Sequence, residues 1–170
     1  MTPHAALPEP VDAETRASHA DHAALRLWLR LFTCSLMIER HIRGQLRETF
    51  GTTLARFDYL AQLARSPQGL RMQELSLRLM VTGGNVTGLT RELAAEGLVE
   101  RRSVQGDRRV QVVRLTAKGR RTFDGMALQH ERWIVALLAG LTARERDTLH
   151  RLLGRLKATV AREAVRRESA

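Results

Sequence analysis

The feature of this sequence that most constrains its fold is a change in hydrophobic periodicity at Gly97. Apolar residues in the segment 83–96 recur at helical spacing, which predicts an amphipathic helix that ends just before this glycine. Residues 98–102 and the β-branched run 110–115 instead predict two short strands, and the Gly-Asp pair at 106–107 is a strong hairpin-turn signal between them. The chain should therefore be mainly α-helical, with a small β-hairpin.

Helical patterns precede this segment. We expect a long helix over about residues 21–50 that ends at Gly51, and a second helix that starts at a Thr52 or Thr53 cap and stops before Pro67. A third helix should cover about residues 71–79.

Two further helices follow the hairpin. Thr116 should cap a helix that runs toward Gly140, and Thr142 should cap the last helix, with Glu145 completing a capping box. Residues 21–170 then form one domain, after an N-terminal arm (1–20) that we expect to be mobile because it holds three prolines and few apolar residues.

The long first helix carries two apolar stripes on adjacent faces. One passes through Leu25 and Phe32, and the other passes through Leu31 and Ile38. A helix with two apolar faces is buried on more than one side. Since a small domain offers little to cover both faces, we expect a partner subunit to pack against this helix.

The charge of the chain indicates a polyanionic partner. There are 28 Lys and Arg residues against 18 Asp and Glu, a formal net charge of +10, and all but Lys118 and Lys157 of the positive residues are arginine. The planar fork of arginine suits phosphates and guanine edges, so we place nucleic acid ahead of a membrane surface. Aromatic residues make up 4%, too few for the stacking platforms of single-strand binders. Double-stranded DNA is the expected partner.

Other classes of protein find little support. No uncharged apolar run approaches the ~20 residues of a membrane span, and the N-terminus lacks the pattern of a secretory signal. The single cysteine, Cys34, excludes an intrachain disulfide framework and a thiolate zinc cluster, and fits a reducing cytoplasm. There is no metal-binding histidine spacing, no nucleophile elbow and no P-loop lysine. We expect a cytoplasmic protein that is not an enzyme and has no cofactor, metal or membrane partner.

Two short helices joined by a tight turn and followed by a basic hairpin predict a winged helix-turn-helix over about residues 53–116. The second helix of such a pair fits the major groove of DNA, and the hairpin, or wing, reaches the adjoining minor groove or phosphates. Val86, Leu89 and Leu93 should face the core. The residues expected on the outer face of that helix are then Gly84, Asn85, Thr87, Gly88 and Arg91. On this outer face, Asn85 could read adenine and Thr87 could touch a thymine methyl or a phosphate.

The stretch 69–119 resembles the DNA-binding core of the MarR family of transcriptional regulators. Two motifs carry the resemblance. One is the segment 96–102 that closes the second helix, and the other is the wing signature, in which Asp107 and Arg109 are followed by a strand and the Leu-Thr-x-x-Gly pattern at 115–119. The flanking helices occur in the same order, so the resemblance covers about residues 22–165. Any one motif would be weak evidence, whereas the ordered set is specific.

The resemblance implies a homodimer joined by its first and last helices, at about residues 21–50 and 117–166. It also implies a pseudo-palindromic operator and relief of repression by a small ligand. By the same resemblance, Arg109 enters the minor groove and Asp107 orients the wing, while Thr82 caps the helix that reads DNA. The predicted DNA-binding set is Arg71, Thr82, Gly83, Gly84, Asn85, Thr87, Gly88, Arg91, Arg101, Asp107, Arg108 and Arg109.

The glycines of this set have two interpretations. Gly83, Gly84 and Gly88 remove side-chain readout but allow the backbone to approach DNA closely, at a cost of roughly 1 kcal/mol each in mid-helix. Alternatively, residues 83–85 are simple turn chemistry. Arg109 and the shape of the DNA would then carry more of the specificity. The wing arginines also have a plain alternative, as a solvated basic turn.

An anionic effector, such as an aromatic carboxylate or its coenzyme-A thioester, is our hypothesis for the ligand. Glu39 and Arg43 continue an apolar stripe of the first helix, so they are polar groups on a face that should be covered. An i,i+4 ion pair with no ligand is the equal alternative for these two residues. The candidate effector-binding set is Trp28, Glu39, Arg40, His41, Arg43 and Arg56.

Two other functions remain as alternatives. One is an architectural protein that binds DNA through charge without sequence choice. The other is a redox-sensing regulator that uses Cys34, although we favour this cysteine as a small, buried, apolar residue.

Overall fold

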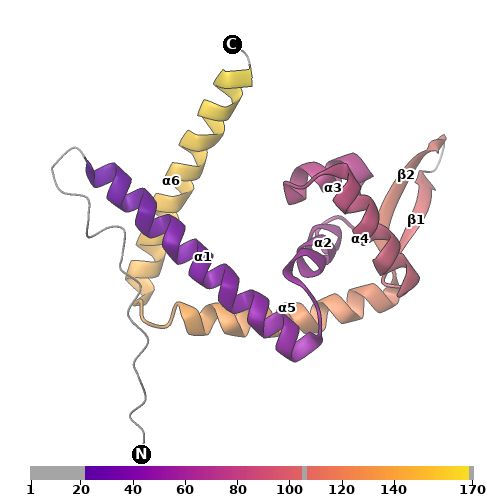
Figure 1. Cartoon of the computed structure of the whole chain (residues 1–170), viewed down its shortest axis with the longest axis horizontal. Coiled ribbons are helices and arrows are strands. Elements are labelled where there is room, and N and C mark those ends of the chain that lie inside the picture. The colour runs from indigo at the N-terminus through magenta and orange to yellow at the C-terminus, as the bar shows by residue number, and fades with distance from the viewer. Residues whose placement is uncertain (1–21, 105–106, 169–170) are drawn as a thin grey trace, which may run out of the picture. The chain divides into compact units, whose positions relative to one another are not determined.

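The computed structural model describes residues 22–104 and 107–168, without the side chains of residues 104, 107–111 and 168. The predicted arm (1–20) and the hairpin turn at 105–106 lie outside these residues, although the second turn residue, Asp107, begins a strand. The described chain consists of helices and one two-stranded antiparallel hairpin, as expected (Figure 1). It divides into two compact units, with the boundary between Arg120 and Arg121.

The elements agree closely with the sequence pattern. They are α1 (Ala23–Phe50), α2 (Leu54–Ala64), α3 (Met72–Leu79), α4 (Gly83–Ala95), β1 (Val99–Val104), β2 (Asp107–Leu115), α5 (Ala117–Leu137) and α6 (Ala143–Glu168). The hairpin is longer than predicted, because pairing continues beyond an irregularity after Ser103 and joins Val104 to Asp107. Helix α5 ends at Leu137, short of the expected Gly140.

The helix ends follow local chemistry. Gly51 adopts the left-handed conformation (φ 61°) that glycine tolerates, and its N–H donates to the carbonyl of Arg47. Thr53 Oγ1 accepts from the N–H of Arg56 at 3.3 Å and caps α2. At α6, Thr142 Oγ1 accepts from the N–H of Glu145 at 3.3 Å, and the Glu145 carboxylate accepts from the N–H of Thr142 at 2.8 Å. The predicted capping box is confirmed.

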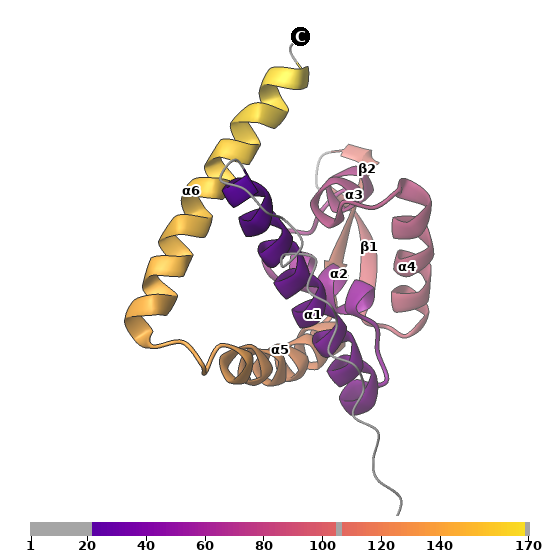
Figure 2. The same ribbon diagram turned by 60° about the vertical axis from the view of Figure 1, so that its left-hand side comes forward.

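The core of the first unit forms around α2. This helix contacts α1, α3, α4 and β2, and Figures 1 and 2 show α2, α3, α4 and the hairpin gathered in one cluster. Leu70 extends the sheet by one bridge to Val113, with N–H···O distances of 2.9 and 2.8 Å. The fully buried side chains are those of Leu46, Tyr59, Leu60, Leu63, Leu75, Val86, Thr90, Leu93 and Val113. The cluster fixes the positions of α4 and of the hairpin base.

The apolar stripes of α1 and α6 are exposed in the single chain. Within α1, Ile42 and Leu46 are the buried residues. Every described side chain of α6 is exposed. Cys34 is exposed as well, which corrects its predicted burial. Cover of these apolar faces by a partner subunit stays a prediction.

Candidate nucleic-acid interface

A fixed turn joins α3 to α4. Met80 ends α3 in the left-handed conformation (φ 54°), and the N–H of Val81 donates to the carbonyl of Ser76 at 3.2 Å. Ser76 Oγ also donates to the carbonyl of Val81 at 2.5 Å. These bonds satisfy carbonyl and amide groups at the end of α3, as in a Schellman motif. The turn therefore holds the start of α4 in a defined position relative to α3.

A buried pair of hydroxyl groups sets the rotation of α4 about its own axis. Tyr59 Oη of α2 lies 2.5 Å from Thr90 Oγ1 of α4, and both residues are completely buried. Thr90 Oγ1 also lies 2.7 Å from the carbonyl of Val86, to which it donates, so the hydroxyl of Tyr59 donates to Thr90. Burial raises the pKa of Tyr59, which keeps this donor neutral.

The outward face of α4 is as predicted. Asn85, Thr87 and Arg91 are exposed, together with Gly84, whereas Gly88 is half-buried. Thr87 Oγ1 donates to the carbonyl of Gly83 at 3.0 Å, so its methyl group and oxygen lone pairs remain for an outside partner.

Thr82 differs from the prediction. It occupies the N-cap position of α4 with an extended backbone, but its side chain makes no capping hydrogen bond. The first backbone N–H groups of α4 therefore do not donate to the Thr82 hydroxyl. Such amides form an anion-binding site when a phosphate approaches a helix N-terminus.

The glycines of α4 are not required by the fold. A Cβ added at Gly83, Gly84 or Gly88 meets nothing within 4 Å, and none of the three has a positive φ. Glycine inside a helix costs stability relative to alanine. The internal packing of the chain therefore gives no reason for these residues.

Three exposed arginines lie on α4 or on the segments that contact it. Arg71 precedes α3, Arg91 lies on α4, and Arg101 lies on β1. Their guanidinium groups form no hydrogen bond or ion pair with the described residues. These cations can be used for phosphate contacts without first breaking an ion pair.

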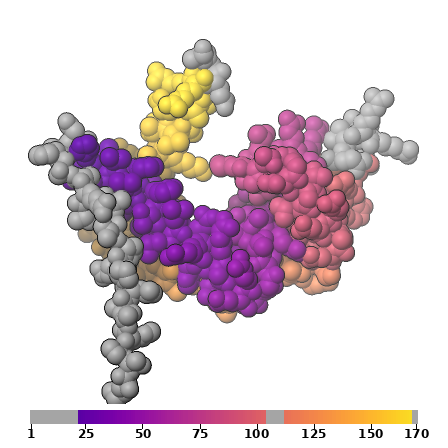
Figure 3. Space-filling model, viewed as in Figure 1, coloured from indigo at the N-terminus to yellow at the C-terminus, as the bar shows by residue number. Residues whose placement is uncertain are grey.

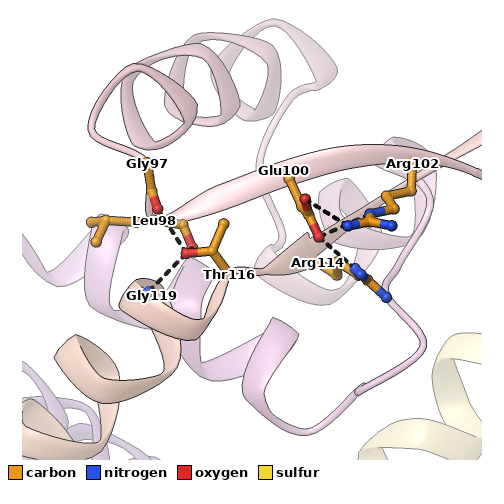
Figure 4. Close-up of polar contacts among 7 residues, drawn as sticks. All are labelled: Gly97, Leu98, Glu100, Arg102, Arg114, Thr116 and Gly119. Atoms are coloured by element: carbon orange, nitrogen blue, oxygen red, sulfur yellow. Dashed lines mark hydrogen bonds and ion pairs between the residues drawn. The ribbon is translucent and has the colours of Figure 1, made fainter.

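Arg102 lies next to Arg101 but is held within the hairpin. Its Nε is 3.0 Å from Glu100 Oε1, and Arg114 Nε is 2.7 Å from the same oxygen (Figure 4). The two guanidinium groups lower the pKa of the Glu100 carboxyl. Side chains alternate along a strand, which explains why Arg101 points away from this cluster.

The base of the wing depends on a close approach at Gly119. Thr116 Oγ1 accepts from the N–H of Gly119 at 3.0 Å and donates to the carbonyl of Gly97 at 2.7 Å (Figure 4). A Cβ on Gly119 would lie 1.9 Å from the carbonyl oxygen of Leu98. The Leu-Thr-x-x-Gly pattern is therefore a structural joint between α5 and β1, and the predicted cap at Thr116 is confirmed.

The predicted wing residues are described only in part. The backbones of Asp107, Arg108 and Arg109 belong to β2, while their side chains lie outside the described residues. Their DNA contacts remain predictions.

The candidate effector residues do not form one cluster with described contacts. Arg43 pairs with Glu39 on α1, which is the ion-pair alternative. Trp28 stacks on Phe32 with ring centroids 5.6 Å apart. Arg40 and His41 are exposed on α1.

Arg56 pairs with Glu96, a contact that the sequence pattern does not reveal. This pair joins α2 to the end of α4, and Lys118 Nζ of α5 donates to the carbonyl of Glu96 at 2.8 Å. The hydrogen bond from Arg56 is the main cause that lowers the pKa of Glu96. Forty residues separate the two partners, so no local spacing signals the contact.

The described residues hold neither a metal-binding cluster nor a membrane-spanning helix. No group of three or more His, Cys, Asp or Glu side chains there could hold a metal ion. Among the described helices, none combines the length and the apolar character that a membrane span requires.

Comparison with known proteins places this geometry among regulators. Residues 50–110 match the family model described as MarR family. The HTH-type transcriptional repressor YetL of Bacillus subtilis is 30% identical, over 85% of this chain and 86% of YetL. The transcriptional activatory protein BadR of Rhodopseudomonas palustris is 32% identical, over 61% of this chain and 60% of BadR.

A crystal structure gives the same result. The MarR family transcriptional regulator from Silicibacter pomeroyi is 33% identical, with a TM-score of 0.67, over 84% of this chain and 99% of that chain. The chain spans 60% to 86% of the length of four curated relatives, and less than two thirds of two of them.

Proposed function

The chain belongs to the MarR family of transcriptional regulators, and on this premise we propose that it binds a specific sequence in double-stranded DNA and acts as a repressor. The observation that carries the proposal is the outward face of α4, on which Asn85, Thr87 and Arg91 are exposed. Arg71 before α3 and Arg101 on β1 are exposed as well. Major-groove recognition requires base-reading side chains on an exposed helix face and cations for the phosphates. YetL, which matches over most of both chains, is named as a repressor, and this supports repression as the mode of regulation.

The contacts divide into readout and positioning. Asn85 is suited to a bidentate contact with adenine, and the Thr87 methyl group is suited to a thymine. Arg71, Arg91 and Arg101 would bind phosphates and fix the register, while the free amides at the start of α4 would take a further phosphate. The open space at Gly84 and Gly88 favours close approach of the α4 backbone to the groove over simple turn chemistry.

The wing would supply the minor-groove contact. Arg109 would enter the minor groove with Arg108 beside it, and Asp107 would orient the strand. A narrow minor groove has an enhanced negative potential that attracts arginine, so this contact reads the shape of the DNA.

A homodimer would bring two copies of α4 to one duplex. The exposed apolar side chains on α1 and α6, including Leu25, Phe32, Leu152 and Leu156, support an assembly through the first and last helices. In a two-fold dimer, the two reading helices lie about 34 Å apart, one turn of DNA, and bind a pseudo-palindrome.

A small anionic effector would release the DNA. Arg40 and His41 are exposed, whereas Arg43 and Arg56 each hold a carboxylate that an anionic ligand would have to displace. A ligand with a 100-fold preference for the DNA-free conformation supplies about 2.7 kcal/mol, which is within ordinary coupling.

Footprinting on the DNA upstream of the chain's own gene tests the DNA-binding part. We expect a protected pseudo-palindrome, and weaker protection by Arg109→Ala at equal stability. No protected site would contradict the proposal, and equal binding by Arg109→Ala would contradict the role of the wing. Calorimetric titration with benzoates, hydroxycinnamates and their thioesters tests the effector, and the absence of heat from all of them would remove that hypothesis.

A further inference from the structure

Two large apolar side chains are exposed next to the start of α4. Leu77 is 72% exposed and Met80 is 94% exposed, the two largest values among the exposed large hydrophobic side chains of the described residues. The other described members of that group lie on α1, α5 and α6. The proposed assembly through the first and last helices involves α1 and α6, whereas Leu77 and Met80 belong to neither of these helices. The α3–α4 segment lies at the surface of its unit (Figure 3).

Met80 occupies a position where glycine would be easier to accommodate. Its φ of 54° is the one positive value of a non-glycine residue in the described chain. L-residues with a Cβ are disfavoured in this conformation, and glycine is the usual residue after a helix that ends in this way. A side chain that is 94% exposed makes almost no packing contact that could offset the strain. The fold alone therefore does not account for methionine at this position.

The place of the pair in the fold points to its partner. Met80 stands three residues before Gly83, the first residue of α4, and Leu77 lies one helical turn earlier on α3. Figures 1 and 2 both show the turn from α3 to α4 at the same end of the unit as the end of β1 and the start of β2. The first two residues of α4, Gly83 and Gly84, offer no side-chain readout, which leaves Asn85 as the first reading side chain of the helix.

Resting on the proposed function, we propose that Leu77 and Met80 are specificity-determining residues that select thymine by an apolar contact with its C5 methyl group. The edges that base pairs present in the major groove are otherwise hydrogen-bond donors and acceptors, so this methyl is the group that an aliphatic side chain recognises there. Methionine suits the role because it is unbranched and polarisable and adapts to an irregular surface. The pair replaces part of the readout that the glycines of α4 lack.

Replacing thymine by deoxyuridine removes only this methyl and tests the inference. A duplex selected from a random library by the full-length protein is resynthesised with deoxyuridine at each thymine in turn, and binding is measured by fluorescence anisotropy. We expect the wild-type protein to lose about three- to fivefold in affinity at one symmetry-related thymine per half-site, as for one buried methyl group. The double variant Leu77→Ala with Met80→Gly should bind the thymine and deoxyuridine duplexes with equal affinity. The single variant Met80→Leu should keep the preference for the thymine duplex.

The variants also separate readout from stability. Met80→Gly relieves the strained backbone, so it should unfold at the same urea concentration as the wild type or a higher one, while its preference for thymine falls. An equal thymine-to-deoxyuridine ratio in the wild type and in the double variant would overturn the inference and leave the proposed function intact. If no sequence is enriched from the library, both fail.

Discussion

Tyr59 and Thr90 form a completely buried hydroxyl pair, 2.5 Å apart, that joins α2 to the face of α4 opposite its exposed residues. Thr90→Val should lower the free energy of unfolding by about 1–3 kcal/mol, because it leaves the hydroxyl of Tyr59 buried without its partner. Tyr59→Phe should cost less, about 1 kcal/mol, since Thr90 keeps its bond to the carbonyl of Val86. Urea denaturation measures both, and an equal stability of Thr90→Val and the wild type would contradict the role of the pair.

Gly119 is required by its contact with β1. Gly119→Ala should destabilise the protein by about 2–3 kcal/mol, because the new Cβ would lie 1.9 Å from the carbonyl oxygen of Leu98 and the backbone would have to move. Gly125 is the matched control on the same helix, where a Cβ meets nothing within 4 Å. Gly125→Ala should stabilise by about 0.5–1 kcal/mol. Thermal unfolding that ranks the two variants in the opposite order would refute the close approach.

A substitution at Gly88 should change the stability of the protein and its affinity for DNA in opposite directions. Gly88→Ala should raise the free energy of unfolding by up to about 1 kcal/mol, since the site is open and helical. If the helix backbone lies against DNA, the added methyl group should cost about 1 kcal/mol of binding, or roughly fivefold in operator affinity. Unchanged affinity in a binding titration would contradict a close approach of the α4 backbone to DNA at Gly88.

The ion pair between Arg56 and Glu96 should make stability depend on pH in the acid range. The pKa of Glu96 lies below its ordinary value of 4.5, so the stabilisation is complete above about pH 4.5 and is lost as the pH falls through the lowered pKa. Glu96→Gln should lose less stability over this range than the wild type. The effect should not exceed about 1 kcal/mol, because the carboxylate is 46% exposed.

The control for this prediction is Glu92→Gln, an exposed position on the same helix with no described ion pair. Urea midpoints measured between pH 3 and pH 6 check the difference. A parallel loss of stability in Glu96→Gln and the wild type would show that the pair does not contribute.

The sequence predicted what depends on local chemistry. Hydrophobic period, turn residues and caps are short-range signals, and they located the helices, the hairpin, the Thr142–Glu145 capping box and the outward face of α4. The resemblance identified residues 115–119, but the reason for its glycine appeared only when Leu98 was placed against it.

Contacts across long sequence separations were missed. Tyr59 and Thr90 are 31 residues apart, and Arg56 and Glu96 are 40 residues apart, so no spacing rule connects them. Thr82 occupies the predicted N-cap position of α4 but makes no capping hydrogen bond, because residue type sets the tendency to cap, whereas the rotation of one hydroxyl decides whether the bond forms. Exposure of Cys34 and of the α1 stripes also could not be read from periodicity, which shows a face and not what covers it.

The central claim is that this protein reads the sequence of a DNA duplex through α4. The most direct test is the ratio of dissociation constants for a selected operator and for a scrambled duplex of equal length and composition, at 0.15 M salt. We expect the operator to bind at least about 10³-fold more tightly, as for specific recognition. Equal affinity for the two duplexes would contradict it.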